Sequence, residues 1–222
     1  MCHTYSDKPA AYFGTPRYDL IAMLSGSGLR VLEIGCGAGA TGAALLQTGK
    51  AAWVSGCEML SEQAEMAAAV LNEVVVGDIG EMTLPWPPES FDCIIAGDVL
   101  EHLIDPWQVL TRIRLLLRQD GLLLVSLPNV RNWHVVYQLL IKDEWRYQVV
   151  GVMDKTHLRF FTRRSAEKML TDCGYELLDV RPFFRLLSTR RFNRLTGGLA
   201  ERFVAERWLF KARCNGAREE TT

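Results

Sequence analysis

The segment RVLEIGCGAGATG, residues 30–42, constrains the fold of this chain more than any other feature. An apolar run that enters a cluster of glycines predicts a buried strand, a tight turn and then a helix. Glycines permit positive φ and close approach of a ligand, and the helix that follows offers unpaired N–H groups. The spacing fits G-x-G-x-x-G/A in two registers, from Gly35 to Ala40 and from Gly37 to Gly42. The turn therefore predicts a nucleoside cofactor without selecting one.

A carboxylate, Glu33, stands near the end of this strand, two residues before Gly35. A dinucleotide would bring a pyrophosphate to the turn, and a nearby carboxylate repels it, whereas a ligand with an ammonium group is attracted. S-adenosylmethionine carries such an ammonium and no phosphate. We therefore expect this cofactor in place of NAD. The alternative is that Glu33 only accepts hydrogen bonds from loop amides, a role that would not exclude the first.

Two further carboxylates end the next predicted strands. Glu58 can accept both hydroxyls of a ribose, which NAD and S-adenosylmethionine share. Asp78, within Gly77-Asp78-Ile79, can accept a hydrogen bond from an adenine amino group, with the N–H of Ile79 facing a ring nitrogen. Its alternative role is to cap the loop, because Asp favours such turns.

Asp98, Glu101 and His102 follow the fourth predicted strand, at the carboxyl end where open α/β sheets bind ligands. Such a group could bind a metal ion, but no other His or carboxylate is spaced to complete a set. We therefore predict no metal site. The alternative to a ligand site is a charged loop in which Glu101 and His102 form structural hydrogen bonds.

Strands and helices alternate through the first 128 residues, which predicts right-handed β-α-β crossovers and a parallel sheet. Strands are expected over residues 30–34, 53–59, 73–76, 91–96 and 122–127. Helices are expected over residues 18–25, 41–47, 61–70 and 106–118, with Ser61 and Asp105 as caps of the last two. Beyond an irregular aromatic segment, Thr162 caps a helix over 163–172, and strands follow over 175–183 and 206–213. Residues 185–203 have loose helical character, broken at Gly197 and Gly198.

The composition indicates one globular domain with a large core, because 49% of the 222 residues are hydrophobic and 23% are charged. Residues 1–10 lack the pattern of a signal peptide, and no apolar run reaches the ~18 residues of a membrane span. Six cysteines without C-x-x-C spacing indicate free thiols and a cytoplasmic protein. The net charge is −7 over residues 1–141 and +6 over residues 142–222. The second half therefore has a solvated basic face or contacts something anionic, such as a phosphorylated substrate or a lipid surface.

As a set, VLEIGCGAG, Glu58, GDI at 77–79 and FDCIIAGDVLEHL resemble the class I S-adenosylmethionine-dependent methyltransferases. LRQDGLLLVSLPNV and DKTHLRFFT are similar to the subgroup that includes ubiquinone-pathway O-methyltransferases and methyltransferases of bacterial sugar and natural-product clusters. The resemblance spans residues 12–213. It implies a Rossmann-like α/β fold with a seven-stranded, mostly parallel sheet, an antiparallel C-terminal edge hairpin and helices on both faces.

The resemblance also implies a single methyltransferase domain with four parts. A helical cap over 1–28 precedes a cofactor-binding core over 29–128, an acceptor-binding lid over 129–161, and a region over 162–222 with a helix, the strand hairpin and a basic helical insertion. Tyr12 and Phe13 are expected to fold over the cofactor. Carried over by position, the cofactor-binding residues are Glu33, Gly35, Cys36, Gly37, Gly39, Glu58, Met59, Asp78, Ile79, Gly97, Asp98, Val99 and His102.

The implied reaction is methyl transfer to a small-molecule, glycan or lipid-linked acceptor, most readily at a hydroxyl oxygen, with an amine as the alternative. A hydroxyl needs a general base, and His157 is the first candidate, followed by His102 and His134. The alternative for His157 is a structural role with Asp154 and Thr156, which would join the lid to the sheet. The lid aromatics could stack on the acceptor or form a small satellite core; they are Trp133, Tyr137, Trp145, Tyr147, Phe160 and Phe161.

Two rival functions remain from the sequence, an NAD-dependent oxidoreductase and a non-catalytic binding subunit. Glu33 and the lack of a Tyr-x-x-x-Lys pair disfavour the first, and the intact cofactor positions disfavour the second. Nucleic acid is not expected as a partner, because the pI is near 6.4 and the arginines form no organised motif. The apolar residues of the basic segment 183–203 are expected to pack on the sheet or on a second subunit, with a membrane surface as the alternative. A monomer or a homodimer is compatible with this.

Overall fold

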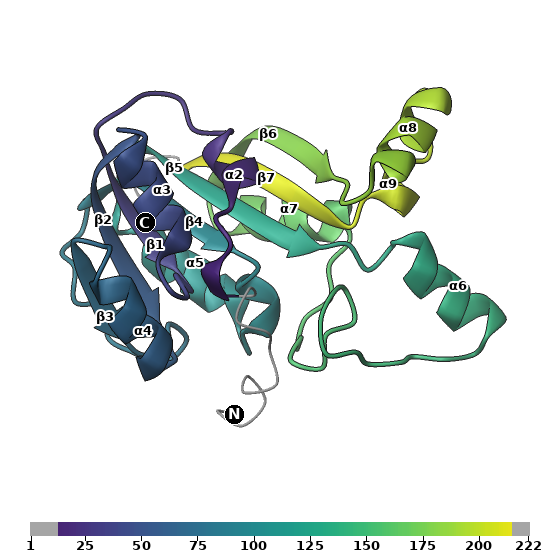
Figure 1. Cartoon of the computed structure of the whole chain (residues 1–222), viewed down its shortest axis with the longest axis horizontal. Coiled ribbons are helices and arrows are strands. Elements are labelled where there is room, and N and C mark those ends of the chain that lie inside the picture. The colour runs from purple at the N-terminus through teal and green to yellow at the C-terminus, as the bar shows by residue number, and fades with distance from the viewer. Residues whose placement is uncertain (1–12, 215–222) are drawn as a thin grey trace, which may run out of the picture.

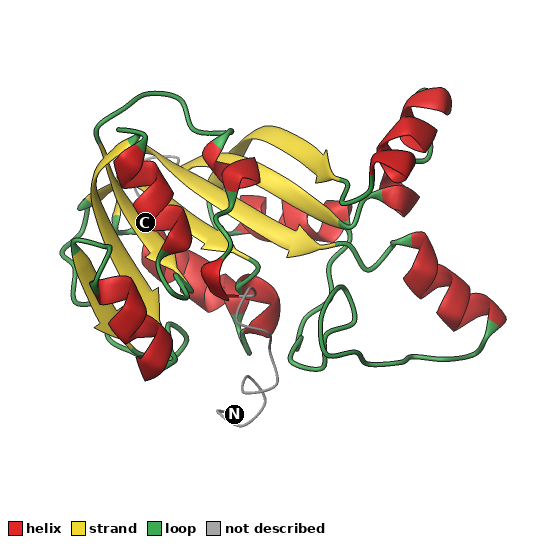
Figure 2. Ribbon diagram, in the orientation of Figure 1, coloured by secondary structure: helices red, strands yellow, loops and turns green. Residues whose placement is uncertain are grey.

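The structure is a computed structural model that describes residues 13–214. Within this range the chain forms one seven-stranded sheet in the order β3-β2-β1-β4-β5-β7-β6 (Figure 2). The strands are β1 (Leu29–Ile34), β2 (Ala51–Glu58), β3 (Glu73–Val76), β4 (Phe91–Gly97), β5 (Leu117–Pro128), β6 (Tyr175–Phe183) and β7 (Arg207–Cys214). The first five pair in parallel, and β7 pairs antiparallel with both β5 and β6. The expected mostly parallel sheet with an antiparallel C-terminal hairpin is confirmed.

Helices cover both faces of this sheet and create two cores (Figure 1). On one face, buried residues of α2 (Tyr18–Ile21), α3 (Ala40–Gln47) and α4 (Ser61–Ala68) pack on β1 and its neighbours. On the other face, α5 (Pro106–Arg114) and α7 (Arg163–Asp172) cover the sheet. The central strands are therefore buried on both sides, which explains their continuous apolar sequences.

The sheet order reverses between β1 and β4, and this reversal positions the ligand site. In a parallel sheet, the crossovers on either side of such a switch point diverge and leave a crevice at the carboxyl ends of the strands. The glycine turn after β1 and the segment after β4 both open into this crevice. The 3-10 helix η2 (Leu100–His102) lies there as well.

Several boundaries differ from the expected ones for local reasons. Helix α2 ends at Ile21, four residues earlier than expected. Helix α5 ends at Arg114 because β5 begins at Leu117, and Gly121 lies inside that strand. Ser61 is the first residue of α4 and not its cap, because Leu60 occupies the N-cap position without a side-chain hydrogen bond. Asp105 and Thr162 do cap their helices, as predicted.

Two helical segments project beyond the sheet (Figure 1). One is α6 (Trp133–Ile141), which begins at Asn132 within the segment expected to be irregular. The other is the pair α8 (Leu187–Leu195) and α9 (Glu201–Val204), separated by the predicted break at Gly197 and Gly198. Helix α8 has no buried residue, and Leu195 and Leu199 are 86% and 88% exposed. Of the two expected contacts, packing of this helix on the sheet is therefore wrong, because the helix points away from it, and packing on a second subunit stays a prediction.

No helix within residues 13–214 is both long and apolar enough to cross a membrane.

Candidate active site

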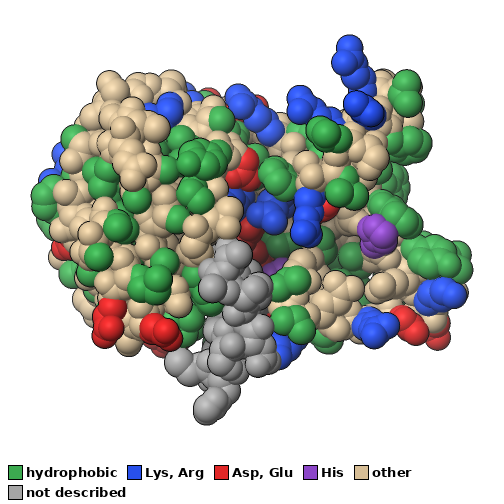
Figure 3. All heavy atoms as spheres, in the orientation of Figure 1, with side chains coloured by type: hydrophobic (Ala, Val, Ile, Leu, Met, Phe, Trp, Pro, Cys, Tyr) green, Lys and Arg blue, Asp and Glu red, His purple; other side chains and the backbone are tan. Residues whose placement is uncertain are grey.

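A cavity of about 780 Å³ lies at the carboxyl ends of β1 to β4. In Figure 3, charged side chains of both signs gather where this face of the molecule is hollowed. All but one of the thirteen cofactor-binding residues predicted from the sequence line this cavity: Glu33, Gly35, Cys36, Gly37, Glu58, Met59, Asp78, Ile79, Gly97, Asp98, Val99 and His102. The exception is Gly39, the N-cap of α3, where an added Cβ would meet Ala67 and Val70 of the segment after β2. Gly39 therefore allows α3 and α4 to approach each other.

The glycine turn holds a backbone that other residues would strain. Gly35 and Gly37 have φ of +65° and +53°, in the left-handed region. A Cβ at Gly35 would lie 2.6 Å from Val99 Cγ2, and a Cβ at Gly37 would lie 2.7 Å from the carbonyl oxygen of Phe13. Phe13 also lines the cavity, as predicted, whereas Tyr12 lies outside the described residues. The turn is thus packed between the segment after β4 and the N-terminal segment.

Glu33 is buried below this turn and also lines the cavity. Its Oε2 accepts a hydrogen bond of 2.9 Å from the N–H of Gly42, in the first turn of α3. Burial raises the pKa of Glu33 to about 7, although hydrogen bonds from Thr41 and Gly42 oppose the rise. The carboxylate therefore accepts a hydrogen bond from the first turn of α3 and also lines the cavity, and its contact with an ammonium group stays a prediction.

Glu58 and Asp78 stand where the sequence predicts, but loop amides use part of their hydrogen-bonding capacity. Glu58 accepts 2.9 Å hydrogen bonds from the N–H groups of Gly37 and Leu60, one on each oxygen. Asp78 accepts one of 2.8 Å from Gly80 through Oδ1, the loop cap considered as its alternative role. Each carboxylate oxygen can accept more than one hydrogen bond, so these contacts orient the groups without preventing contact with a ligand.

Asp98 is the centre of an ion-pair cluster that the sequence did not reveal. It has a φ of +57°, and its Oδ2 contacts Arg17 Nη1 at 2.8 Å and Arg207 Nη1 at 2.5 Å. Its Oδ1 accepts a 2.7 Å hydrogen bond from the hydroxyl of Ser126. Burial alone would raise the pKa of Asp98, but Arg207 and Arg17 outweigh it and hold that pKa below its usual value. The two arginines line the cavity and fix this carboxylate in its charged form.

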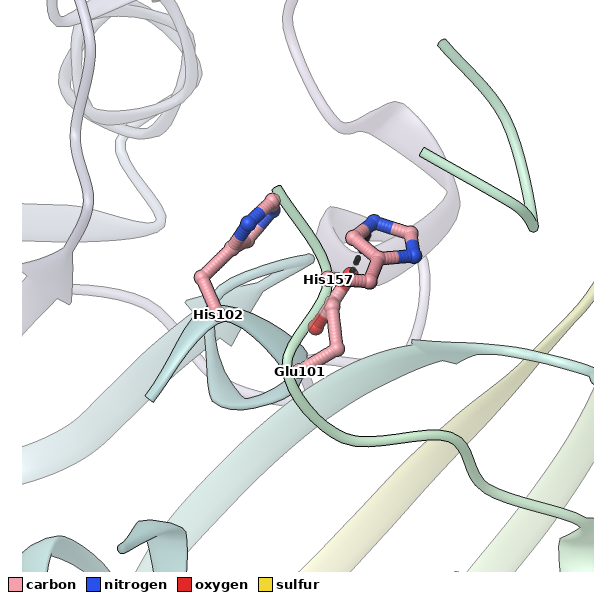
Figure 4. A group of neighbouring side chains, drawn as sticks. All are labelled: Glu101, His102 and His157. Atoms are coloured by element: carbon pink, nitrogen blue, oxygen red, sulfur yellow. Dashed lines mark ion pairs between the residues drawn. The ribbon is translucent and has the colours of Figure 1, made fainter. Parts of the chain in front are cut away.

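Glu101, His102 and His157 form a second cluster beside the cavity (Figure 4). The rings of the two histidines meet edge to face with centroids 4.8 Å apart. His157 Nε2 lies 3.9 Å from Glu101 Oε1. Within the described residues, neither oxygen of the buried Glu101 carboxyl has a hydrogen-bond partner. Burial and the nearby Asp98 raise the pKa of Glu101 well above its usual value, which favours the neutral carboxyl.

The ligand atoms of these three side chains lie within 4.8 Å of one another, so the structure supplies the histidine that the sequence spacing could not identify. Two imidazoles and a carboxylate are a set that a transition metal ion accepts. A protonated Glu101 can donate a hydrogen bond toward an imidazole nitrogen. The carboxyl and the two imidazoles can therefore lie together without a metal ion between them. The absence of a metal site stays a prediction.

The three candidate bases differ in position. His102 lines the cavity, and its Nδ1 lies 3.1 Å from the carbonyl oxygen of Thr156. His157 is buried behind it, with Nδ1 3.0 Å from the carbonyl oxygen of Val152, and is not among the lining residues. His134 is exposed on α6, where its ring contacts that of Trp133, and does not line the cavity either. The structure thus brings His102 and His157 together and leaves His134 apart.

The lid reaches the cavity through a short polar stretch. Lys155, Thr156 and Leu158 are lining residues, and the N–H groups of Leu158 and Arg159 donate to the carbonyl oxygen of Glu101. Asp154 Oδ1 accepts from both the N–H and the hydroxyl of Thr156. These contacts join the lid to η2, the structural role considered for this motif. None of the six lid aromatics is among the lining residues, and Phe161 is part of the main core.

The donor set of the cavity fits S-adenosylmethionine. A volume of about 780 Å³ lies within the range of about 300–1,000 Å³ typical of small-ligand sites. The acidic groups surround the glycine turn, where a pyrophosphate would require basic or neutral ones. Arg17 stands next to the turn, because its N–H donates to the Thr41 hydroxyl at 3.2 Å and its side chain packs against Gly97. A carboxylate and a guanidinium at one end match a ligand with both an ammonium and a carboxylate.

Comparison with known proteins gives independent results. A family model described as a methyltransferase domain matches residues 10–180. A ubiquinone biosynthesis O-methyltransferase from Aeromonas salmonicida is 30% identical over 180 residues, covering 78% of this chain and 74% of that protein. The Neisseria meningitidis serogroup A protein of the same description is 27% identical over 164 residues, and the match covers 69% of this chain and 66% of that protein, just under two thirds of its length.

A solved structure shares the fold. An S-adenosylmethionine-dependent methyltransferase from Methanosarcina mazei superposes with a TM-score of 0.65 at 19% identity, covering 90% of this chain and 99% of that one.

Proposed function

Because this chain belongs to the methyltransferase-domain family, we propose that it methylates a hydroxyl oxygen of a small-molecule or glycan acceptor. The class I methyltransferase fold, the methyltransferase activity and the use of S-adenosylmethionine follow from the family, the relatives and the fold. The acceptor, the atom methylated and the role of each residue are our proposals. The observation that supports the proposed residue roles is the cavity in which Glu33 and Arg17 flank the glycine turn.

The cofactor supplies a methyl group on a positively charged sulfur. Around it, Glu33 would face the amino group and Arg17 the carboxylate of its methionine part. Glu58 would accept from the ribose hydroxyls, and Asp78 with Ile79 would contact the adenine. Phe13 and Val99 exclude water from the glycine turn, which matters because the positive charge is lost as the methyl moves and a dry site favours that loss.

We propose His102 as the general base, in place of His157, which was first among the candidates. The contact of His102 Nδ1 with a carbonyl oxygen requires a proton on Nδ1, so in the neutral ring the lone pair is on Nε2. His102 lines the cavity, and because its Nε2 is buried in this structure, acceptor binding would have to expose that atom for it to reach the proton that it removes. His157 and Glu101 would then be positioning residues behind it.

A hydroxyl acceptor is supported by the relatives, which are described as O-methyltransferases. Both are distant, at about 30% identity, and neither fixes the acceptor of this chain. An amine acceptor is the alternative, and it would need no base once neutral. The exposed α8 and its arginines support contact with a second subunit or with a membrane that presents a lipid-linked acceptor, as the basic charge of residues 142–222 suggests.

Calorimetry with S-adenosylhomocysteine tests the cofactor contacts. We expect wild type to bind it and Glu33→Gln and Arg17→Gln each to bind about tenfold more weakly or worse, since each removes one charged contact. The exposed Glu62→Gln and Arg181→Gln are the matched controls. Equal affinity in all five proteins would contradict the assignment of the methionine end.

Methyl transfer tests the reaction. S-adenosylhomocysteine release would be measured with paired hydroxyl and amine versions of each acceptor in a panel of phenols, sugars and lipid-linked sugars. We expect the hydroxyl member of a pair to be methylated and His102→Gln to lower kcat by about 10²–10⁴. Turnover of the amine member with an undiminished kcat in His102→Gln would favour N-methylation.

A further inference from the structure

Arg207 occupies the part of the cavity that lies beyond the predicted cofactor contacts. It is the first residue of β7 and pairs in register with Pro128 at the end of β5 and Phe183 at the end of β6. The cofactor contacts lie on β1 to β4 and the turns after them, whereas β7 is on the far side of β5 in the sheet. Asp98 therefore separates Arg207 from the glycine turn, with Arg17 on the turn side.

The guanidinium of Arg207 is held on one side only. Its Nη1 contacts Asp98 Oδ2 at 2.5 Å, and its plane lies over the ring of Phe183 at 5.0 Å from the centroid. Among residues 13–214, neither Nε nor Nη2 of Arg207 has a hydrogen-bond partner. Its side chain lines the cavity and is 30% exposed. A fixed guanidinium with this pair of donors remaining is suited to a planar carboxylate or a phosphate, which it can bind through two parallel hydrogen bonds.

Arg207 shares its carboxylate partner with a second guanidinium. Asp98 Oδ2 is shared with Arg17, so one carboxylate faces two guanidiniums. Arg17 has a second partner in Asp19, at 2.8 Å, but Arg207 has no other ion pair within the described residues. Burial raises the pKa of Glu101, another acidic side chain near the cavity, and favours its neutral form. Counting Asp19, two guanidiniums face two carboxylates, and Arg207 is the one whose only ion-pair partner is shared, so an anion on its remaining donors would complete its contacts.

The carboxylate of the cofactor is not expected to occupy the remaining donors of Arg207. Arg17 is next to the glycine turn and to Thr41, where the methionine end is proposed, and it is the guanidinium within reach of that carboxylate. Arg207 lines the same cavity as His102 of η2 and Thr156 and Leu158 of the lid. An anionic group bound there would belong to the second substrate.

We propose that Arg207 binds an anionic group, a carboxylate or a phosphate, on the methyl acceptor and so selects acceptors that carry one. This inference rests on the proposed methyltransferase function. Arg207 belongs to the positively charged part of the chain, residues 142–222, and lines a cavity whose other side is acidic. The proposal therefore gives a function to one of the basic residues in that part.

The test uses enzyme saturated with S-adenosylhomocysteine and inorganic phosphate as the probe. We expect calorimetry to give a phosphate dissociation constant of about 1–10 mM for wild type and binding at least about tenfold weaker for Arg207→Gln. Arg207→Lys keeps the positive charge but loses the two parallel N–H donors of the guanidinium, so it should bind phosphate with intermediate strength. Arg181→Gln on β6, exposed and paired with Asp179, is the matched control and should bind phosphate as wild type does.

Affinity for S-adenosylhomocysteine separates this inference from the function on which it rests. We expect Arg207→Gln and Arg207→Lys to bind it within about threefold of wild type, and a normal thermal transition to show that both fold. Failure of wild type to bind S-adenosylhomocysteine would contradict the proposed function itself. Phosphate binding that is absent from wild type, or equal in Arg207→Gln, would overturn the role of Arg207 alone.

Turnover gives a second readout. For an acceptor with a carboxylate or phosphate, Arg207→Gln should raise KM about tenfold or more and change kcat little, because the contact is made equally in the ground state and the transition state. The neutral amide of the same acceptor should be a poor substrate for wild type and equally poor for the variant. Preference of wild type for the neutral member of each pair would refute the proposal.

Discussion

Glu33 shows how one residue can serve both the fold and the ligand. Because the unligated protein holds the pKa of Glu33 at about 7, this side chain is half protonated near neutral pH. An ammonium group binds the ionised form, so ligand binding should release a proton. We expect the affinity for S-adenosylhomocysteine to rise about tenfold from pH 6 to pH 8, measured by calorimetry in buffers of different ionisation enthalpy. Glu33→Gln should bind more weakly and lose this rise, and an unchanged slope would assign the proton to another group.

Glu101 predicts a pH dependence of stability. Its pKa in the folded protein is raised, so between its ordinary value and the raised one the folded state keeps a proton that the unfolded chain has released. The free energy of unfolding therefore falls as pH rises through this window. We expect Glu101→Gln, which keeps the shape of the neutral carboxyl, to gain in Tm relative to wild type on going from pH 5 to pH 8. The exposed Glu62→Gln is the control, and a parallel shift in both variants would contradict the prediction.

At the residue scale, the sequence predicts the acidic positions well and the basic ones not at all. Glu33, Glu58 and Asp78 each follow an apolar strand, so their place at the sheet edge comes from local pattern. Arg17 and Arg207 reach Asp98 across 81 and 109 residues of sequence, and no period or spacing marks them. His157 likewise meets His102 only because the lid folds back on η2. Contacts of this kind depend on tertiary structure.

At the scale of elements, the strands are the best predicted, because strands covered on both faces are short apolar runs with polar ends. The bounds of β3 and β6 are those expected, and β5 begins five residues earlier and ends one residue later than expected. Helix α6 was missed because its sequence, WHVVYQLLI, is apolar on nearly every side and lacks the 3.6-residue pattern of a surface helix. Its signal was the cap at Asn132, whose side chain accepts from the N–H of His134.

The N-terminal cap of α7 offers a prediction at this scale. Thr162 and Ser165 exchange hydrogen bonds between side chain and backbone, which satisfies two N–H groups at the helix start. Thr162→Ala should lower the free energy of unfolding by about 1 kcal/mol, measured by urea denaturation. Thr111→Ala, within α5, removes a hydroxyl that donates to the carbonyl of Trp107 and should change it by no more than about 0.5 kcal/mol. Equal losses would show that the cap contributes nothing specific.

At the scale of the whole molecule, the packing of the sheet controls the reactivity of the thiols. The five cysteines within residues 13–214 are free and buried, and burial raises the pKa of each, to about 12 for Cys57. The Cys2→Ser variant should therefore react slowly with a disulfide reagent at pH 8. In guanidinium, its five remaining thiols should all react rapidly. Cys36 lines the cavity, so S-adenosylhomocysteine should slow its modification further. Fast reaction of the native protein would mean that the sheet opens readily.

The place of β7 in the sheet has a consequence for the order in which the protein is made. Strand β6 has β7 as its sheet neighbour, yet it is synthesised before β7, with α8 and α9 between them. Once residues 184–206 have emerged from the ribosome, β5 and β6 are both outside it while β7, the strand that pairs with each of them, is not yet available. Arg207 arrives with the strand that joins them, so the acceptor side of the cavity is completed after the cofactor side. In this interval two open edges are exposed at once, and nascent-chain aggregation or chaperone contact is most to be expected there.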